Sequence, residues 1–191
     1  MKVSLVENKL EKENISSYIL NDLKTWFEDE EAVKNYIEKS KDYIFFKASE
    51  NGKNFGFIVY KKTSDYTIEI FVMGVLKKYH RNHIGRNLFK KSIEILKKYN
   101  YEFVQVKTLK EGIDDGYDKT NKFYQALGFR KFEVIEEIWS KENPCQIYVK
   151  SINWIKNVFK FEKKKWTILI YLLILSWIYL KYFLWYNFTK S

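Results

Sequence analysis

The sequence predicts an α/β (α+β) fold in which a mixed, mostly antiparallel sheet of about six to seven strands is flanked by about four helices. Residues 66–75 are dense in β-branched and aromatic side chains, which is typical of a strand. Residues 84–99 then place apolar side chains at helical spacing, which indicates an amphipathic helix. Upstream, the patterns indicate a strand, two helices and two more strands, an order that differs from the alternating crossovers of a Rossmann unit.

The elements before this unit follow from local signals. Residues 2–7 predict a first strand, and Asn14 is the expected cap of a helix that runs through about Phe27. A second helix is expected over about residues 30–40. Strands at 43–48 and 55–61 are joined by Asn51-Gly52, which is a strong signal for a two-residue hairpin turn.

The central strand and the elements after it complete the predicted sheet. Alternation along the strand places Ile68, Ile70 and Val72 on one face and Thr67, Glu69, Phe71 and Met73 on the other. The helix after it carries its apolar stripe at Ile84, Leu88, Ile95 and Tyr99. The remaining elements are a strand at 101–108, a short helix from Asp118 to Leu127, and strands at 131–139 and 145–151.

Composition limits the classes of function. The chain has 191 residues and a formal net charge of +10, which would suit a nucleic-acid binder. Residues 151–191, however, hold 7 of the 34 Lys and Arg and 1 of the 24 Asp and Glu, so the predicted domain is only mildly basic. Cys145 is the single cysteine, which excludes an internal disulfide and indicates a small residue beside a strand rather than a nucleophile.

The turn between the central strand and its helix predicts an anion site. It carries His80, Arg81, Asn82 and Arg86 just where a helix begins. Free backbone N–H groups, the positive end of the helix dipole and guanidinium groups would converge there. A phosphate or pyrophosphate is the expected ligand. The two histidines of the chain, His80 and His83, have no further ligands nearby in the sequence, so no metal is expected.

Two segments resemble the hallmarks of the GNAT superfamily of N-acetyltransferases. YHRNHIGRNL resembles its acyl-CoA signature, with His80 at the Arg/Gln place, His83 at the first Gly place and Gly85 at the second. DKTNKFYQALGF resembles the second hallmark, in which a helix ends in Tyr, three residues and Gly-Phe, and Tyr124 is that tyrosine. The resemblance covers about residues 1–151, taken here as one domain, and implies the GNAT fold with acetyl-CoA as co-substrate.

The resemblance implies roles for individual residues. Glu69 stands where the histone-acetylating branch of the superfamily keeps its general base, and Tyr124 would return a proton to the coenzyme thiolate. The alternatives are that Glu69 is a half-exposed strand residue and that Tyr124 only packs its helix onto the sheet. A backbone donor for the tetrahedral intermediate is expected near a bulge at 73–75. The implied coenzyme-binding residues are Met73, Gly74, Val75, Arg81, Asn82, His83, Ile84, Gly85, Arg86 and Asn121.

The acceptor is expected to be a small-molecule amine or an amine of a peptide or protein. Trp26 and Phe27 either wall its pocket or pack in the core. An acidic loop either attracts a cationic amine or is simply solvated; its acids are Glu111, Asp114, Asp115 and Asp118. The sequence leaves the oligomeric state open, with a homodimer among the alternatives.

The C-terminal segment predicts a membrane anchor. Residues 152–165 are a basic juxtamembrane linker, and a helix over 166–188 would be about 34 Å long, enough for a hydrocarbon core of about 30 Å. The lysines before the span favour a single-pass protein of the cell membrane with its catalytic domain in the cytoplasm. The alternative is a helix that packs on a partner or lies in the membrane surface.

Three functions follow from these patterns. The favoured one is a membrane-tethered N-acetyltransferase that acts by direct attack in a ternary complex. The second is a catalytically degenerate domain that binds acyl-CoA as a sensor or scaffold, since His83 replaces a glycine. The third is a basic nucleic-acid binder, which the uneven placement of charge disfavours.

Overall fold

The structure is a computed structural model that describes residues 1–152 and 169–176. The chain divides into two compact units, Met1–Ile152 and Asn153–Ser191. The helices of the first unit are α1 (Lys9–Asp22), α2 (Glu30–Ser40), α3 (Ile84–Leu96) and α4 (Asp115–Ala126), with short 3-10 turns η1 (Lys77–Tyr79), η2 (Lys97–Tyr99) and η3 (Glu136–Ile138). Its strands are β1 (Lys2–Val6), β2 (Ile44–Glu50), β3 (Lys53–Lys62), β4 (Thr67–Val75), β5 (Phe103–Leu109), β6 (Arg130–Ile135) and β7 (Cys145–Ser151).

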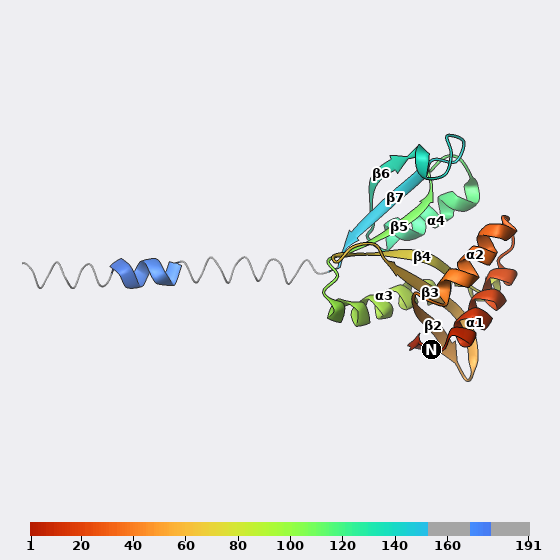
Figure 1. The fold of residues 1–191 in the computed structure, drawn as a ribbon, viewed down its shortest axis with the longest axis horizontal. Coiled ribbons are helices and arrows are strands. Elements are labelled where there is room, and N and C mark those ends of the chain that lie inside the picture. Colours follow the sequence, from red (N-terminus) through yellow and green to blue (C-terminus); the bar gives the residue numbers. More distant parts are fainter. Residues whose placement is uncertain (153–168, 177–191) are drawn as a thin grey trace, which may run out of the picture. The chain divides into compact units, whose positions relative to one another are not determined.

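One mostly antiparallel sheet organises the first unit (Figure 1). Its seven strands lie in the order β1-β2-β3-β4-β5-β7-β6, and β4 and β5 pair in parallel while the other neighbouring strands pair antiparallel. The parallel pair is the one that α3 connects, as a crossover requires. The predicted mixed sheet and its helices are therefore confirmed within residues 1–152.

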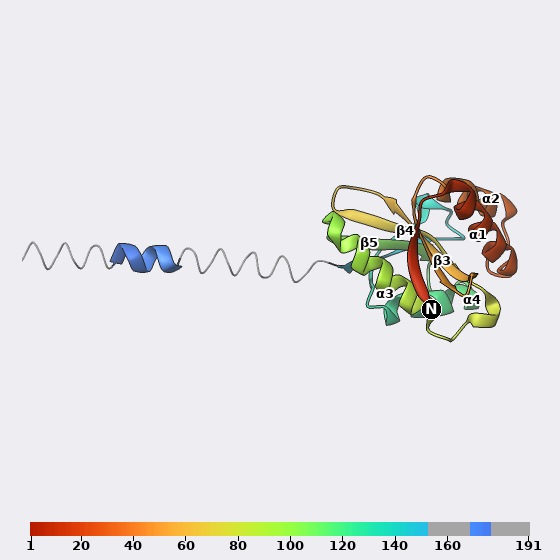
Figure 2. The same cartoon turned by 90° about the horizontal axis from the view of Figure 1, so that it is seen from below.

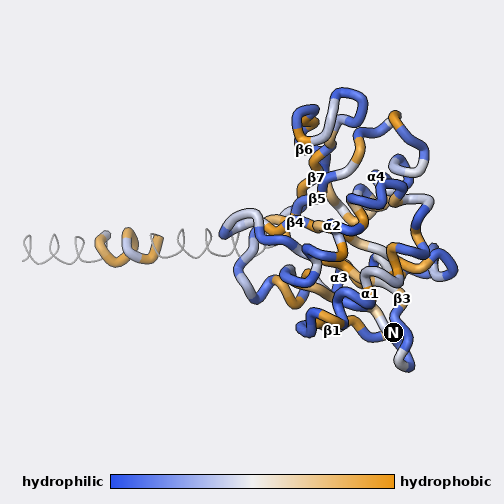
Figure 3. The backbone as a smooth tube through the Cα atoms, turned by 45° about the vertical axis from the view of Figure 1, so that its right-hand side comes forward, coloured by the Kyte–Doolittle hydropathy of each residue, from blue (hydrophilic) through white to orange (hydrophobic). Residues whose placement is uncertain are grey.

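Two hydrophobic clusters cover the two faces of this sheet. Helices α1 and α2 lie on one face, where Ile19 and Phe57 are fully buried, and α3 lies on the opposite face, where Leu88 is fully buried (Figure 2). Tyr124 of α4 belongs to the α3 cluster. Apolar stretches of the backbone follow the strands, and the connecting turns are hydrophilic (Figure 3).

A bulge in β4 corrects the predicted faces of the central strand. Val59 pairs with Val72 and Tyr60 with Ile70, so Phe71 is an extra residue on β4. Ile68 and Ile70 therefore pack in the α3 cluster, while Val72 packs in the α1 cluster. The expectation that Ile68, Ile70 and Val72 share one face is wrong, because one inserted residue reverses the alternation.

The helix α1 begins earlier than the sequence predicts. Asn8, not Asn14, is its cap, and the Asn8 Oδ1 accepts a hydrogen bond from the Glu11 backbone N–H at 2.9 Å. The helix ends at Asp22 rather than near Phe27. The second helix is confirmed as Glu30–Ser40, and the hairpin turn is confirmed at Asn51 and Gly52, which both have positive φ.

The later elements differ from prediction mainly at their ends. The buried face of α3 runs through Leu88, Phe89 and Leu96, and Tyr99 is 61% exposed because the helix stops at Leu96 and η2 follows. Asp114 rather than Asp118 caps α4. The strand expected over 131–139 ends at Ile135, where η3 begins.

The described part of the second unit is a helix over residues 169–176, whose apolar side chains are exposed and which is coloured mostly apolar in Figure 3. The predicted linker 152–165 and most of the predicted helix 166–188 lie outside the described residues. Within the described residues, no helix has the length and apolar character that crossing a bilayer requires.

Candidate active site

The strands β4 and β5 part near the middle of the sheet. Their pairing runs from Thr67 opposite Phe103 to Ile70 opposite Val106 and then stops. Beyond that point β5 remains paired with β7 as far as Leu109, while β4 remains paired with β3. The ribbon shows the two strands diverging (Figure 1). We call the unpaired stretch of the two strands beyond Ile70 and Val106 the notch.

The edge of β4 presents backbone donors to the notch. Leu76 N–H donates to the Phe55 carbonyl of β3 at 2.9 Å. Because successive residues of an antiparallel strand turn their N–H groups to opposite sides, the N–H groups of Met73 and Val75 point away from β3 and into the notch. These are the donors that the sequence predicted at 73–75, although the bulge itself lies earlier, at Phe71.

The turn after β4 ends at a helix start with free N–H groups. The N–H groups of Ile84, Gly85 and Arg86 have no intrahelical partner, because they belong to the first turn of α3. The side chain of the cap residue His83 does not accept from them either. Arg81 and His83 both have positive φ, 63° and 58°. His83 thus adopts the backbone conformation that a glycine would take without strain, and its side chain is exposed. The helix start therefore has the free N–H groups that the sequence predicted, and anion binding at this turn, called the anion turn below, stays a prediction.

Close packing holds the start of α3 against two other elements. A Cβ added at Gly85 would lie 3.1 Å from the Met73 Cε and 3.3 Å from the Phe123 Cζ. Gly85 therefore brings the helix N-terminus next to the strand edge and to α4. His80 is engaged by the protein itself, because its Nε2 lies 2.6 Å from the Val75 carbonyl oxygen and its ring lies against Trp26.

Glu69 is buried and has charged and polar partners. Its Oε2 accepts a hydrogen bond from Gln105 Nε2 at 2.9 Å and lies 2.9 Å from Lys107 Nζ. Because Ile68 and Ile70 face α3, Glu69 faces α1 and α2. Burial, together with the nearby Tyr117 and the charge of Glu69, raises the pKa of the Tyr36 phenol of α2.

Tyr124 packs on the other face of the sheet. Its ring makes edge contacts with Phe123 and Phe129, and burial raises the pKa of the Tyr124 phenol well above its usual range. One turn earlier on α4, Asn121 is fully buried and its Nδ2 donates to the Leu109 carbonyl at 2.9 Å. The Asn121 Oδ1 and the Thr108 hydroxyl are buried with no partner among the described residues.

Glu69 faces α1 and α2, whereas the Tyr124 ring packs in the α3 cluster. Tyr36 of α2 lies near both groups, because its phenol interacts with the charge of Glu69 and with the Tyr124 phenol. The notch is the place where β4 and β5 no longer pair, so the backbone groups of β4 that face β5 have no partner there among the described strands.

Sequence reasoning missed the partners of Glu69. Gln105 and Lys107 alternate with buried Val104 and Val106 on β5, so their face was readable from the sequence. Their position beside Glu69 was not, because it depends on the register in which β4 and β5 pair.

The acidic loop is largely occupied by internal contacts. Lys131, followed by smaller effects of Tyr148 and Gln125, lowers the pKa of the Glu111 carboxyl. Asp114 caps α4, and the Asp118 Oδ1 accepts from the Gly112 N–H at 2.9 Å. Of the predicted pocket aromatics, Phe27 packs in the α1 cluster, whereas Trp26 lies at the turn beside His80.

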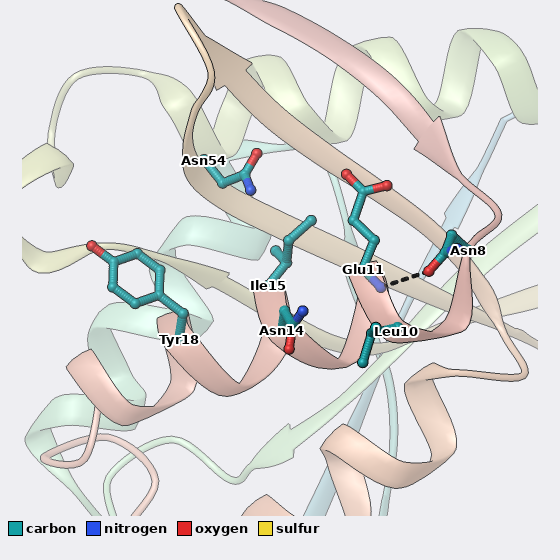
Figure 4. A pocket seen from close by; sticks show the side chains of 7 residues that line it. All are labelled: Asn8, Leu10, Glu11, Asn14, Ile15, Tyr18 and Asn54. Atoms are coloured by element: carbon teal, nitrogen blue, oxygen red, sulfur yellow. Dashed lines mark hydrogen bonds between the residues drawn. The ribbon is translucent and has the colours of Figure 1, made fainter.

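Cys145, the first residue of β7, is fully buried opposite Leu109 of β5, and burial raises the pKa of its thiol, on which Lys107 and Glu69 act with smaller effects. A surface depression along α1 is lined by Asn14 and Tyr18 together with Asn54 of β3 (Figure 4). It includes none of the predicted site residues. Among the described residues, no group of three or more His, Cys, Asp and Glu could hold a metal ion.

The residues present fit coenzyme A. Backbone donors line the notch at the edge of β4, Gly85 lets the start of α3 approach Met73 and Phe123 closely, and the buried amide oxygen of Asn121 has no partner among the described residues. Free N–H groups at a strand edge and at a helix start fit the class of acetyl-CoA-dependent N-acetyltransferases. Residues 9–129 match the Acetyltransferase (GNAT) family, and the chain belongs to this family.

Solved structures agree in fold. The chain is similar to an aminoglycoside 6'-acetyltransferase type Ii, with TM-score 0.66, 18% identity and coverage of 80% of this chain and 97% of that one. It is also similar to an aminoglycoside 6'-N-acetyltransferase complexed with coenzyme A (TM-score 0.63, 18% identity, 80% and 97% covered). A GNAT family acetyltransferase from Elizabethkingia anophelis with acetyl-CoA bound gives TM-score 0.52, 20% identity and coverage of 64% and 83%. No curated protein matches the chain in sequence.

Proposed function

We propose that the chain transfers the acetyl group of acetyl-CoA to a primary amine by direct attack in a ternary complex. The observation that carries this proposal is the notch, because β4 has backbone donors without a partner among the described strands where it parts from β5, and a helix N-terminus with free N–H groups follows it. Such donors stabilise the charge that develops on a carbonyl oxygen when an amine attacks it.

The strand edge and the turn would hold the coenzyme mainly through backbone groups. The N–H groups of Met73 and Val75 would contact the acyl arm and the thioester oxygen, with Gly74 between them. The turn would bind the diphosphate through its main chain, with charge from two guanidinium groups; its residues are Arg81, Asn82, His83, Ile84, Gly85 and Arg86. Asn121 would accept from an amide N–H of the acyl arm.

Two side chains would move protons at the notch. Bound acetyl-CoA supplies an acetyl thioester, which only an uncharged amine attacks. Glu69, on the α1 and α2 side, would take the proton from the incoming ammonium group directly or through water, since an alkyl amine with a pKa of about 10.4 is almost fully protonated at neutral pH. Tyr124, on the other side, would donate its proton to the thiolate as the C–S bond breaks.

The test is turnover of acetyl-CoA by the full chain, followed by release of free thiol, with a panel of amines. Cys145 does not compete for the thiol reagent, because it is fully buried. The panel starts with aminoglycosides, since two of the structural neighbours are named for them, and adds a polyamine and a peptide with a free N-terminus. Thiol release that depends on one amine supports the proposal, and none with any amine contradicts it.

A second function, acyl-CoA sensing without catalysis, is favoured by one observation. The Glu69 carboxylate is already paired with Lys107 and Gln105, so its lone pairs are partly engaged. Coenzyme binding measured by calorimetry, without thiol release and unchanged by Glu69→Gln or Tyr124→Phe, would identify a sensor.

We also propose that residues 166–188 anchor the protein in the cell membrane with the catalytic domain on the cytoplasmic side. The support is the helix over 169–176, whose exposed apolar side chains need a cover, and the run of lysines before it. Removal of residues 153–191 should move the protein from the membrane fraction to the supernatant. Continued sedimentation with membranes would contradict the anchor.

A further inference from the structure

The side chain of His80 joins two segments that are far apart in the sequence. Its Nε2 lies 2.6 Å from the Val75 carbonyl oxygen, and its ring centroid lies 5.4 Å from that of Trp26 in an edge contact. Because a carbonyl oxygen can only accept, the Nε2 carries the proton and donates it to Val75. This contact fixes which ring nitrogen is protonated.

The hydrogen bond from His80 is one of two that hold the Val75–Leu76 peptide at the end of β4. The N–H of Leu76 donates to Phe55 at 2.9 Å on one side of this peptide, and the carbonyl of Val75 accepts from His80 on the other. That carbonyl points to the same side as the N–H groups of Met73 and Val75. Because His80 occupies this acceptor, the N–H is the backbone group of Val75 that is left to a ligand at this edge.

A second pair of contacts ties the same turn to the end of α1. The Asp22 Oδ2, at the last residue of α1, accepts from the Lys77 backbone N–H at 2.7 Å. The Lys77 Nζ lies 5.5 Å from the Trp26 ring centroid, within cation–π range. Trp26 therefore lies between a lysine and a histidine of the turn. Because Trp26 belongs to the segment that joins α1 to α2, these contacts hold that segment against the turn.

We propose that His80 is a positioning residue for coenzyme binding, which acts through the Val75 carbonyl and Trp26 to hold the anion turn in its binding conformation. The inference rests on the proposed function, because it takes this turn to bind the coenzyme diphosphate. His80 stands at the Arg/Gln place of the acyl-CoA signature. Its side chain acts there by contacting the protein backbone.

The test measures CoA affinity by calorimetry, and KM for acetyl-CoA and kcat, on the full chain. His80→Ala should raise the Kd of CoA and the KM about tenfold, the loss of roughly one good hydrogen bond, while kcat at saturation stays within about twofold. His80→Gln, whose amide N–H reaches as far as Nε2, should restore most of the affinity. His80→Asn is the matched control, because its amide is too short and should behave like Ala.

A double-mutant cycle distinguishes coupling between Trp26 and His80 from general destabilisation of the fold. The effects of Trp26→Leu and His80→Ala on the Kd should be non-additive, because the two rings contact one another. Trp139→Leu is the control partner, since Trp139 is 46% exposed beyond β6 and touches neither ring. Its effect should add to that of His80→Ala.

The outcomes distinguish this inference from the proposed function. A wild-type chain that binds no CoA overturns both. A wild-type chain that binds and turns over acetyl-CoA, with an unchanged Kd in His80→Ala, overturns the inference alone. Should His80→Ala fail to fold, the Gln and Asn variants decide, and equal affinity of these two overturns the role of the Val75 contact.

Discussion

The candidate active site has two parts that differ in the kind of group they present. Its backbone half consists of N–H donors at the edge of β4 and the start of α3. Its side-chain half consists of the paired carboxylate of Glu69 and the buried phenol of Tyr124. Backbone N–H groups are present whatever the side chains are, so the backbone half can carry two histidines at motif positions. The properties of the side-chain half depend on its neighbours, because the charge partners of Glu69 come from the strand beside it.

Tyr124→Phe tests the side-chain half and should have the largest effect. The ring keeps its contacts with Phe123 and Phe129, so the fold should persist, while kcat should fall about a hundredfold or more if the phenol is the general acid. Because burial raises the pKa of this phenol, it stays protonated, and its role should cause no loss of kcat between about pH 7 and pH 9. Tyr99→Phe, at an exposed ring, is the control.

Gly85→Val tests the backbone half. A branched side chain would meet Met73 and Phe123, so the helix start should shift and KM for acetyl-CoA should rise about a hundredfold with kcat much less affected. Gly85→Ala adds one methyl group against flexible side-chain ends, and its KM should rise only a few fold. Equal KM values for the two variants would contradict a tightly packed backbone site.

Glu69→Gln tests whether the paired carboxylate acts as the base. The amide keeps the size of the side chain, and kcat should fall about tenfold to a hundredfold, with KM for acetyl-CoA unchanged. The matched control is Glu133→Gln on the exposed strand β6. A Glu69→Gln enzyme with full kcat would assign the proton transfer to another group and leave Glu69 as a partner of Lys107.

Arg81→Ala and Arg86→Ala should have the smallest effects. If backbone groups bind the diphosphate, each loss of a side-chain charge should raise KM for acetyl-CoA only about threefold to tenfold. This increase in KM should become smaller at high salt, which screens the charge. A rise in KM as large as that of Gly85→Val would show that the turn binds through its guanidinium groups, and the two halves of the site would then both depend on side chains.

The sequence predicted the order of elements and the anion turn because both depend on local patterns. Periodicity reveals strands and helices, and a glycine beside basic residues at a helix start marks a turn with free N–H groups. The exact ends were less predictable. Asn8 and Asn14 are both competent caps, and only the packing of α1 on the sheet decides between them.

The side-chain half was harder to predict because it depends on pairing. One extra residue in β4, Phe71, reverses the faces of everything after it, and nothing in the local pattern marks it. The Glu69–Lys107 contact needs the parallel register of β4 and β5, which α3 connects across a long stretch of chain. The sequence could nominate Glu69 but not its neighbours.

The burial of Cys145 makes the chain convenient for labelling. Its sole thiol is buried at the start of β7, so a cysteine introduced on the surface, for example at Tyr99, would be the one position that a maleimide dye or spin label reaches in the folded protein. Movements of individual segments could then be followed without first replacing a native residue.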